Sequence, residues 1–319
     1  MVEIYAEIKN LNVVYETKKN AFGAIKSIYA LNDVSLNIEK GEILAIAGES
    51  GCGKSTLAKT VMKLVEAKSG EININGKNIL KINNTKNFYQ KVQMIFQNPY
   101  SSLNPKMKIG QILSEPLEIN TKYSKKQIHK IIEDKITKVG MGINCLDMYP
   151  HEFSGGQRQR IAIARSLLLD PEFIIADEPV SALDVSIQAQ IINLLIRLKQ
   201  DFNLTFLFIS HDMSVIKYIS DRVGIMYLGE IVEIGKTDEI FNNPKHPYTK
   251  ALLSAIPKLN FEKNSDKIKL LGELPSAENL PNGCKFNTRC PYVMEKCKSE
   301  KPFDIDFSDS HKCKCFLYK

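Results

Sequence analysis

Short apolar runs separated by amphipathic segments set the pattern of this chain. Short, mainly apolar segments, which are typical of buried strands, lie at 43–47, 92–96, 173–178 and 205–210. Apolar residues recur with helical spacing over 128–139 and 187–198. Strands that alternate with helices in this way predict an α/β fold with a mainly parallel core sheet.

A second group of strands shows partial alternation, which is typical of half-buried strands. They lie at 2–15, 31–38 and 69–76, and the last of them closes in an Asn-Gly turn signal. We expect the first strand to end at Tyr15, before a polar, lysine-rich connection over 17–29. Residues 222–234 predict two antiparallel strands that meet at Leu228-Gly229.

From about Asn98 to Pro150 the pattern becomes helical. Ser124 and Gln127 have the spacing of a capping box, and Gly140 is a stop signal after the apolar period. We interpret this stretch as a helical insertion into the α/β core. Two further helices are expected, from Arg158 to Leu169 and from Val185 to Phe202.

The stretch Gly48–Thr56 joins a predicted buried strand to a helical segment that begins at Leu57. Its glycines allow the backbone to turn N–H groups onto an anion, and the helix N-terminus adds aligned dipoles. Lys54 can then reach the outer phosphates, and the Ser55 hydroxyl can join a Mg²⁺ shell. Strand, glycine-rich loop and helix in this order predict a site for a nucleoside triphosphate.

Polar groups end several of the other predicted strands. Gln97 follows the strand at 92–96, Asp177 and Glu178 end the strand at 173–178, and His211 follows the strand at 205–210. Ligands of open parallel sheets meet the carboxyl ends of the strands, so these side chains are candidates for Mg²⁺ or for the attacking water. The Ser154–Gly156 start of a helix is a second candidate anion site.

Bulk properties narrow the class of protein. The 319 residues predict about two domains, and 44% apolar with 25% charged residues is an ordinary composition for a globular protein. No apolar run approaches the roughly 18 residues of a spanning helix, and the N-terminus lacks the features of a signal peptide. We therefore expect a cytoplasmic chain. The net charge of +7 is spread along the sequence and is interpreted as solvated surface rather than a nucleic-acid site.

The ordered set of motifs resembles the ATPase domain of ABC transporters over roughly residues 3–255. The motifs that carry this resemblance are Gly48–Thr56, Gln97, Phe153–Gln157, Asp177-Glu178, Ser181–Asp184 and His211. It implies a P-loop NTPase fold of the ABC type, with a mainly parallel core sheet, an antiparallel β subdomain and a helical subdomain at about 98–165. Residues 256–319 are then a small, cysteine-rich C-terminal extension.

The resemblance also implies a role for each matching residue. Glu178 is the general base, His211 the switch histidine and Gln97 the Q-loop residue. ATP is bound by Tyr15, Gly48, Ser50, Gly51, Cys52, Gly53, Lys54, Ser55, Thr56 and Asp177, and Mg²⁺ by Ser55, Gln97 and Asp177. The residues that act on a nucleotide held by a second chain are Ser154, Gly155, Gly156 and Gln157 of the signature and Asp184 of the D-loop.

Further stretches resemble the oligopeptide and dipeptide importers within this family. They are 96–105, 226–233, 246–253 and the tail from Gly272 to Pro291. The Ser55-Thr56 ending of the P-loop and the region 211–213 favour the F-type ATPase over the D-type. Importers of nickel or of glycosides with the same extension remain alternatives.

The resemblance implies an ATPase, a translocase subunit that energises peptide import from the cytoplasmic face of the membrane. The implied partners are a second ABC ATPase, expected to be a D-type paralogue, two transmembrane permeases and, indirectly, an extracellular peptide-binding protein. The rival interpretation is a soluble ABC ATPase that acts on DNA or ribosomes. Such proteins usually carry long insertions or two ATPase domains, which this sequence lacks, so no nucleic-acid partner is expected.

Five of the seven cysteines lie near the C-terminus. Cytosolic disulfides are rare, and the close pairs typical of zinc sites are absent from this spacing. Four thiolates can hold a [4Fe–4S] cluster, and the resemblance implies one for some members of the family. The candidate ligands are Cys284, Cys290, Cys297 and either Cys313 or Cys315, while a zinc site and reduced structural thiols remain open.

Overall fold

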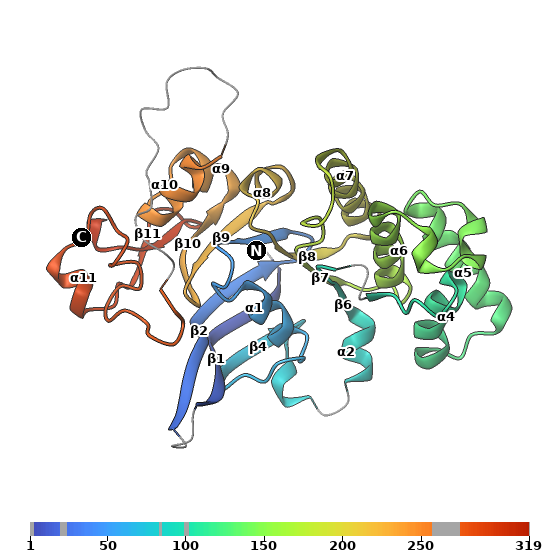
Figure 1. Cartoon of the computed structure of the whole chain (residues 1–319), viewed down its shortest axis with the longest axis horizontal. Coiled ribbons are helices and arrows are strands. Elements are labelled where there is room, and N and C mark those ends of the chain that lie inside the picture. The colour runs from blue at the N-terminus through green and yellow to red at the C-terminus, as the bar shows by residue number, and fades with distance from the viewer. Residues whose placement is uncertain (1–2, 20–23, 83–84, 99–101, 257–274, 319) are drawn as a thin grey trace, which may run out of the picture. The chain divides into compact units, whose positions relative to one another are not determined.

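The computed structural model describes residues 3–19, 24–82, 85–98, 102–256 and 275–318, and the chain divides into two compact units (Figure 1). The first unit comprises residues 1–80 and 210–319, and the second comprises residues 81–209. Among the described residues, no helix combines the length and the apolar character needed to cross a bilayer.

An antiparallel sheet with the order β2-β1-β4-β5 forms one layer of the first unit. Its strands are β1 (Ile4–Lys19), β2 (Ala24–Glu39), β4 (Ser69–Ile74) and β5 (Lys77–Asn78). Asn75 and Gly76 both have positive φ, as an Asn-Gly hairpin turn requires, and this turn is confirmed.

The predicted end of the first strand at Tyr15 is wrong. The strand β1 continues to Lys19 and pairs residue by residue with β2, so most of the expected connection over 17–29 is strand. Backbone hydrogen bonds between antiparallel strands do not need an apolar face, which explains why a lysine-rich sequence continues the ladder.

A second set of strands in the first unit has the order β11-β12-β10-β9-β3. The strands β3 (Ile43–Ala47) and β9 (Arg222–Tyr227) are parallel, and β10 (Glu230–Lys236) returns antiparallel to β9. The predicted meeting point at Leu228-Gly229 is confirmed, because both residues have positive φ there. The C-terminal strands β11 (Asp304–Asp306) and β12 (Lys312–Lys314) extend the sheet beside β10.

Helices of the first unit are short. They are α1 (Lys54–Val61), η1 (Ile79–Lys81, at the boundary of the units), α8 (Met213–Ile219), α9 (Thr237–Asn242), α10 (Pro247–Ser254), α11 (Glu295–Ser299) and η4 (Phe316–Tyr318). The helix α1 begins three residues before the expected Leu57, because Gly53 in a left-handed conformation caps it at Lys54. Lys54, Ser55 and Thr56 therefore lie in its first turn.

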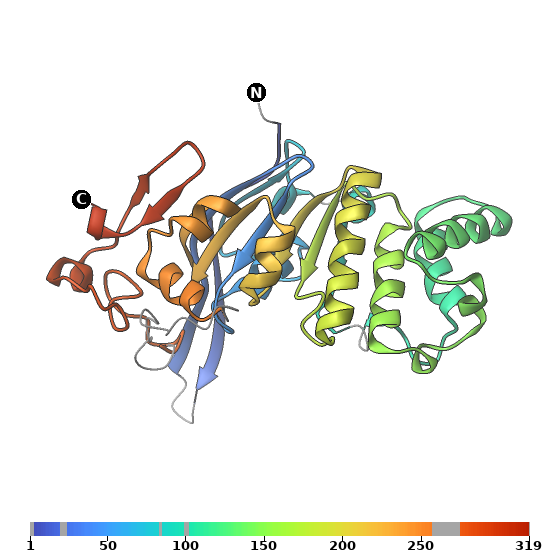
Figure 2. The ribbon, with the colours of Figure 1, turned by 90° about the horizontal axis from the view of Figure 1, so that it is seen from above.

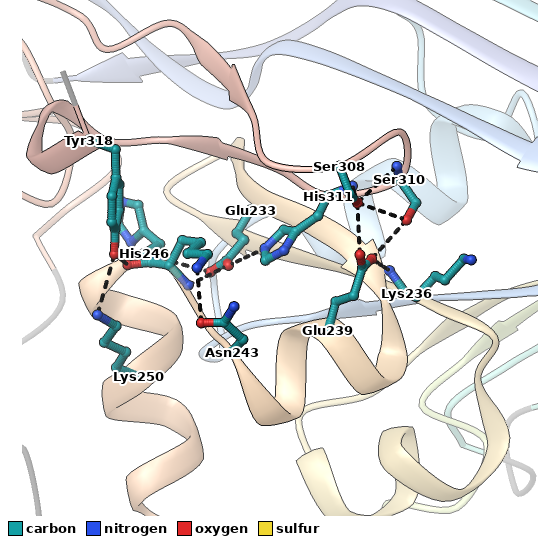
Figure 3. A network of polar contacts seen from close by, with 11 residues as sticks. Glu233, Lys236, Glu239, Asn243, His246, Lys250, Ser308, Ser310, His311 and Tyr318 are labelled. Carbon is teal, nitrogen blue, oxygen red and sulfur yellow. Dashed lines mark hydrogen bonds and ion pairs between the residues drawn. The ribbon is translucent and has the colours of Figure 1, made fainter.

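Buried polar contacts attach the C-terminal hairpin to β10 (Figure 3). The Glu233 carboxylate accepts hydrogen bonds from the Lys245 and His246 amides at 2.7 and 2.9 Å and lies 2.7 Å from His311 Nε2. Burial alone would raise the pKa of Glu233, but its hydrogen bonds, that with His311 foremost, lower it. A satisfied buried carboxylate of this kind fixes the hairpin in one register.

The described residues of the second unit include three parallel strands, β6 (Val92–Ile95), β7 (Phe173–Asp177) and β8 (Thr205–Ile209), with β7 between the other two. Every residue of β7 and β8 is buried. The helices are α2 (Lys86–Lys91), α4 (Ile109–Asn120), α5 (Lys125–Lys138), η2 (Ile143–Asp147), η3 (Pro150–Glu152), α6 (Gly155–Leu167) and α7 (Val185–Phe202). Figure 2 shows α6 and α7 running side by side.

Helix boundaries in this unit follow their caps. The capping box at Ser124 is confirmed, since Ser124 Oγ accepts from the Gln127 amide and Gln127 Oε1 accepts from the Ser124 amide. Ser154 and Gln157 form the same box at the start of α6. Because this cap starts α6 at Gly155, the expected start at Arg158 is three residues too late.

Candidate nucleotide-binding site

The loop that precedes α1 has the backbone of an anion cradle. Gly48, Gly51 and Gly53 all have positive φ, and a Cβ at Gly53 would lie 2.5 Å from the Ala30 carbonyl oxygen. A side chain is therefore excluded there by space as well as by conformation. The exposed residues of the loop are Ser50 and Gly51, so its outer turn is accessible to a ligand.

Lys54 is buried at the base of this loop, with 4% of its surface exposed. Its Nζ donates hydrogen bonds to the Gly48 and Glu49 carbonyl oxygens at 2.7 and 2.9 Å and lies 3.8 Å from Cys52 Sγ. An ammonium has three donors and no acceptor, so a phosphate oxygen is a suitable partner for it. The contact does not make Cys52 reactive, because burial raises the pKa of its thiol.

In the second unit, the structure brings Gln97 and Glu178 together. Gln97 Nε2, just after β6, donates a hydrogen bond to Glu178 Oε2 at 2.9 Å. Glu178 has φ of 47°, a left-handed conformation that costs free energy for a residue with a side chain. Its amide donates to the Ile209 carbonyl at 2.9 Å, which holds this turn against β8.

Asp177 precedes it as the last residue of β7 and is 4% exposed. Carboxylate and hydroxyl oxygens are ligands that Mg²⁺ accepts, so the side chains of Asp177 and, in the first unit, Ser55 fit this ion by donor chemistry. When bound, the ion would supply charge neutralisation at the phosphates.

The signature segment opens α6 at the surface of the second unit. Ser154 and Gln157 are exposed, whereas Gly156 is buried against α7. A Cβ at Gly156 would lie 2.5 Å from Ile187 Cγ2, so glycine allows the close packing of α6 on α7. Asp184, exposed, is the N-cap residue of α7.

The remaining predicted residues lie in the first unit. His211 is exposed and precedes α8, whose first turn is capped by Asp212. Tyr15 is 40% exposed and lies in the middle of the β1–β2 ladder, opposite Ile28. Its role in adenine stacking stays a prediction.

Cysteines of the C-terminal extension are free thiols. Burial raises the pKa of Cys284 to about 12 and that of Cys290 and Cys315 in the same direction, with the neighbouring thiols adding to the shifts. Among the described residues, no three His, Cys, Asp or Glu side chains are arranged to hold a metal ion. The thiol arrangement therefore does not support the predicted iron–sulfur cluster.

Sequence reasoning missed Glu49 and Arg289. Arg289 Nη1 and Nη2 donate to the two Glu49 carboxylate oxygens at 2.7 and 3.0 Å, which joins the C-terminal extension to the glycine-rich loop. The two residues lie 240 positions apart in the chain, and no local pattern predicts such a pair.

Comparison with known proteins settles the family. The family described as "ABC transporter" matches residues 31–181, and "Oligopeptide/dipeptide transporter, C-terminal region" matches residues 232–297. The dipeptide transport ATP-binding protein DppF of Haemophilus influenzae is 50% identical over 96% of this chain and 94% of its own length. This chain belongs to the family of ABC transporter ATP-binding proteins.

Two other relatives in this family agree. DppF of Escherichia coli is 52% identical over 90% of this chain and 87% of its own length. The oligopeptide transport ATP-binding protein AppF of Bacillus subtilis is 44% identical over 99% of this chain and 98% of its own length. The predicted membership in the dipeptide and oligopeptide branch, and the predicted ATPase activity, are confirmed.

Solved ABC cassettes share the fold. The dimeric cassette MJ0796, described as bound to ADP and Pi, has a TM-score of 0.65 and 29% identity over 73% of this chain and 98% of its own. CbiO1 of Clostridium perfringens has a TM-score of 0.65 and 27% identity over 76% of this chain and 92% of its own. The predicted P-loop fold of the ABC type is confirmed.

Proposed function

We propose that this ABC ATPase energises the import of dipeptides or oligopeptides through a membrane transporter. The observation that carries the proposal is the 50% identity to a dipeptide transport ATP-binding protein along nearly the whole chain, together with the match of residues 232–297 to the peptide-transporter C-terminal region. That region is specific to a branch of the family, whereas the ATPase motifs are common to all of it.

The proposed nucleotide site uses the glycine-rich loop, the carboxylates at the end of β7, and His211. Lys54 and the loop amides from Gly48 to Thr56 neutralise part of the triphosphate charge. Ser55, Gln97 and Asp177 would hold Mg²⁺, which would supply further charge neutralisation when bound. Glu178 takes a proton from the attacking water, and His211 helps to position the reacting groups. The left-handed turn and the hydrogen bond from Gln97 support this role for Glu178, since both fix the orientation of its carboxylate.

The proposed assembly is a pair of ATPases on the cytoplasmic face of two permeases. The exposed signature and D-loop residues Ser154, Gln157 and Asp184 would then face a nucleotide bound by a D-type paralogue. Two observations support a dimer: those residues are exposed on the single chain, and the related cassette MJ0796 is described as a dimer.

Reconstitution tests the peptide function. The chain is co-expressed with candidate permeases and a candidate second ATPase from the same organism, and ATP hydrolysis is measured in proteoliposomes with and without a peptide-loaded binding protein. We expect the four subunits to copurify and the loaded binding protein to stimulate hydrolysis. Copurification with ribosomes or DNA, or stimulation by a glycoside or nickel-binding protein alone, would contradict the proposal.

An iron–sulfur cluster in the C-terminal extension stays a separate prediction of the sequence. Its candidate ligands are still Cys284, Cys290, Cys297 and either Cys313 or Cys315. Assays for iron and acid-labile sulfide on anaerobically purified protein test this prediction. The absence of both from the pure protein would contradict the cluster.

A further inference from the structure

The ion pair between Arg289 and Glu49 joins the cysteine-rich extension to the glycine-rich loop. It is bidentate, with 2.7 and 3.0 Å between donors and acceptors, and the side chains are 7% and 27% exposed. A fork-to-fork pair that is largely removed from water is both strong and directional.

Arg289 is held rigidly at its own end. The Arg289 amide donates to the Phe286 carbonyl at 3.0 Å, and the Asn287 amide donates to the Cys284 carbonyl at 3.0 Å, so a tight turn aims the guanidinium. Phe286 is 1% exposed and packs edge-to-face on Tyr227, with the ring centroids 5.2 Å apart. The turn is thus anchored in the core of the first unit.

Glu49 is held at its backbone as well. Its amide donates to the Tyr248 hydroxyl at 2.9 Å, and its carbonyl accepts from Lys54 Nζ at 2.9 Å and from the Cys52 amide at 3.3 Å. The residue that Arg289 grips by its side chain is therefore also the residue whose carbonyl holds the phosphate-binding lysine.

We propose that Arg289 is a positioning residue for ATP binding, through which the C-terminal extension holds the glycine-rich loop in its binding conformation. The inference rests on the proposed nucleotide site and adds to it a residue outside the ATPase motifs. The guanidinium acts through Glu49 and does not touch the nucleotide. The loop is then preorganised, so less of the free energy of ATP binding is lost in ordering it.

The test measures the Kd of a fluorescent ATP analogue on the full-length chain. Arg289→Gln and Glu49→Gln are each expected to raise the Kd by roughly 5- to 30-fold, with a smaller change in kcat. The Kd of the double variant is expected to be no higher than that of the weaker-binding single variant, because both substitutions break the same contact. Arg289→Lys keeps the charge but loses the bidentate contact, so its Kd is expected to lie between those of the parent and of Arg289→Gln.

Lys298→Gln is the matched control. Lys298 lies in the same extension and pairs with Glu295 at 2.7 Å, and both side chains are exposed. This variant loses one positive charge without the contact to Glu49. Its Kd is expected to stay within about twofold of the parent value.

The direction in which the Kd changes in the two single variants distinguishes a positioning role from a purely electrostatic effect on the nucleotide. If only charge mattered, Arg289→Gln would raise the Kd of the anionic nucleotide and Glu49→Gln would lower it. Opposite signs, or a Kd within about twofold of the parent in both variants, would overturn the inference. If Arg289→Gln fails to fold, Glu49→Gln alone decides by the same criterion. A parent chain that does not bind ATP would instead refute the proposed nucleotide site itself.

Discussion

Gln97 Nε2 donates a hydrogen bond to Glu178 Oε2 across 2.9 Å, and this contact joins the ends of two strands in the second unit. The two residues are 81 positions apart, and Glu178 reaches Gln97 from a left-handed backbone conformation. A conformation that costs free energy persists only where surrounding contacts determine it. Here the hydrogen bond from Gln97 orients one carboxylate oxygen of Glu178, which agrees with the general-base role proposed for it.

Glu178→Gln is expected to retain ATP binding and to lower kcat by about 10²–10⁴, because the isosteric amide keeps the hydrogen-bonding shape but cannot take a proton. Equilibrium nucleotide binding and steady-state phosphate release measure the two properties. Glu172→Gln is the control, since Glu172 lies just before β7 and pairs with Lys91 at 2.6 Å on the surface. Hydrolysis by the Glu178 variant at the parent rate would show that another group is the base.

Local signals were sufficient for most of the fold around the site. The buried run of β3, the helix α7 and the turn at Leu228-Gly229 were predicted at their observed positions, because apolar period and turn chemistry are local properties. The end of β1 was not, since pairing with β2 overrides the polar composition. The Arg289–Glu49 pair could not be predicted either, because tertiary packing alone brings these residues together.

Two serines with the same local structure allow the signature to be tested. Ser124 and Ser154 both cap a helix in a Ser-x-x-Gln box, each accepting from the amide three residues later at 3.4 Å. Replacing either by alanine is expected to cost about 1 kcal/mol of stability, measured by chemical denaturation. Only Ser154→Ala is expected to lower kcat, by roughly 10- to 100-fold, because only Ser154 is proposed to contact a nucleotide across a dimer. Equal rates in the two variants would remove Ser154 from the site.

Alanine variants of two glycines in the glycine-rich loop distinguish backbone strain from steric exclusion. Gly51→Ala meets no atom within 4 Å and is expected to cost only the left-handed penalty of about 1–2 kcal/mol. Gly53→Ala places a Cβ 2.5 Å from the Ala30 oxygen and is expected to cost about 3 kcal/mol or more and to abolish nucleotide binding. Thermal denaturation and nucleotide titration measure both.

Gly76→Ala is the control for these glycine variants. Gly76 has φ of 71° and no atom within 4 Å of an added Cβ, but it lies in the β4–β5 turn. It is expected to lose the same stability as Gly51→Ala with an unchanged affinity for ATP. A Gly53→Ala protein as stable as the Gly51→Ala protein would contradict the steric argument.

His246 is expected to make the stability of the chain depend on pH. Its ring is 1% exposed, and burial lowers its pKa from 6.5 to about 4. Because the unfolded chain binds a proton more readily, the stabilisation is complete above about pH 6.5 and is lost as the pH falls toward about 4. The loss amounts to about 3 kcal/mol.

His246→Asn is expected to flatten this pH dependence, since asparagine can still cap α10 as His246 Nδ1 does by accepting from the Tyr248 amide. Urea denaturation of the nucleotide-free chain between pH 4.5 and 7 measures it. The stabilisation from Glu233, whose pKa is lowered, is complete above the ordinary carboxyl pKa of 4.5 and is lost only below that pH, outside this window. His129→Asn replaces an exposed histidine and should leave the slope unchanged. If the slope persists in the His246 variant, a different buried group controls the acid sensitivity of the fold.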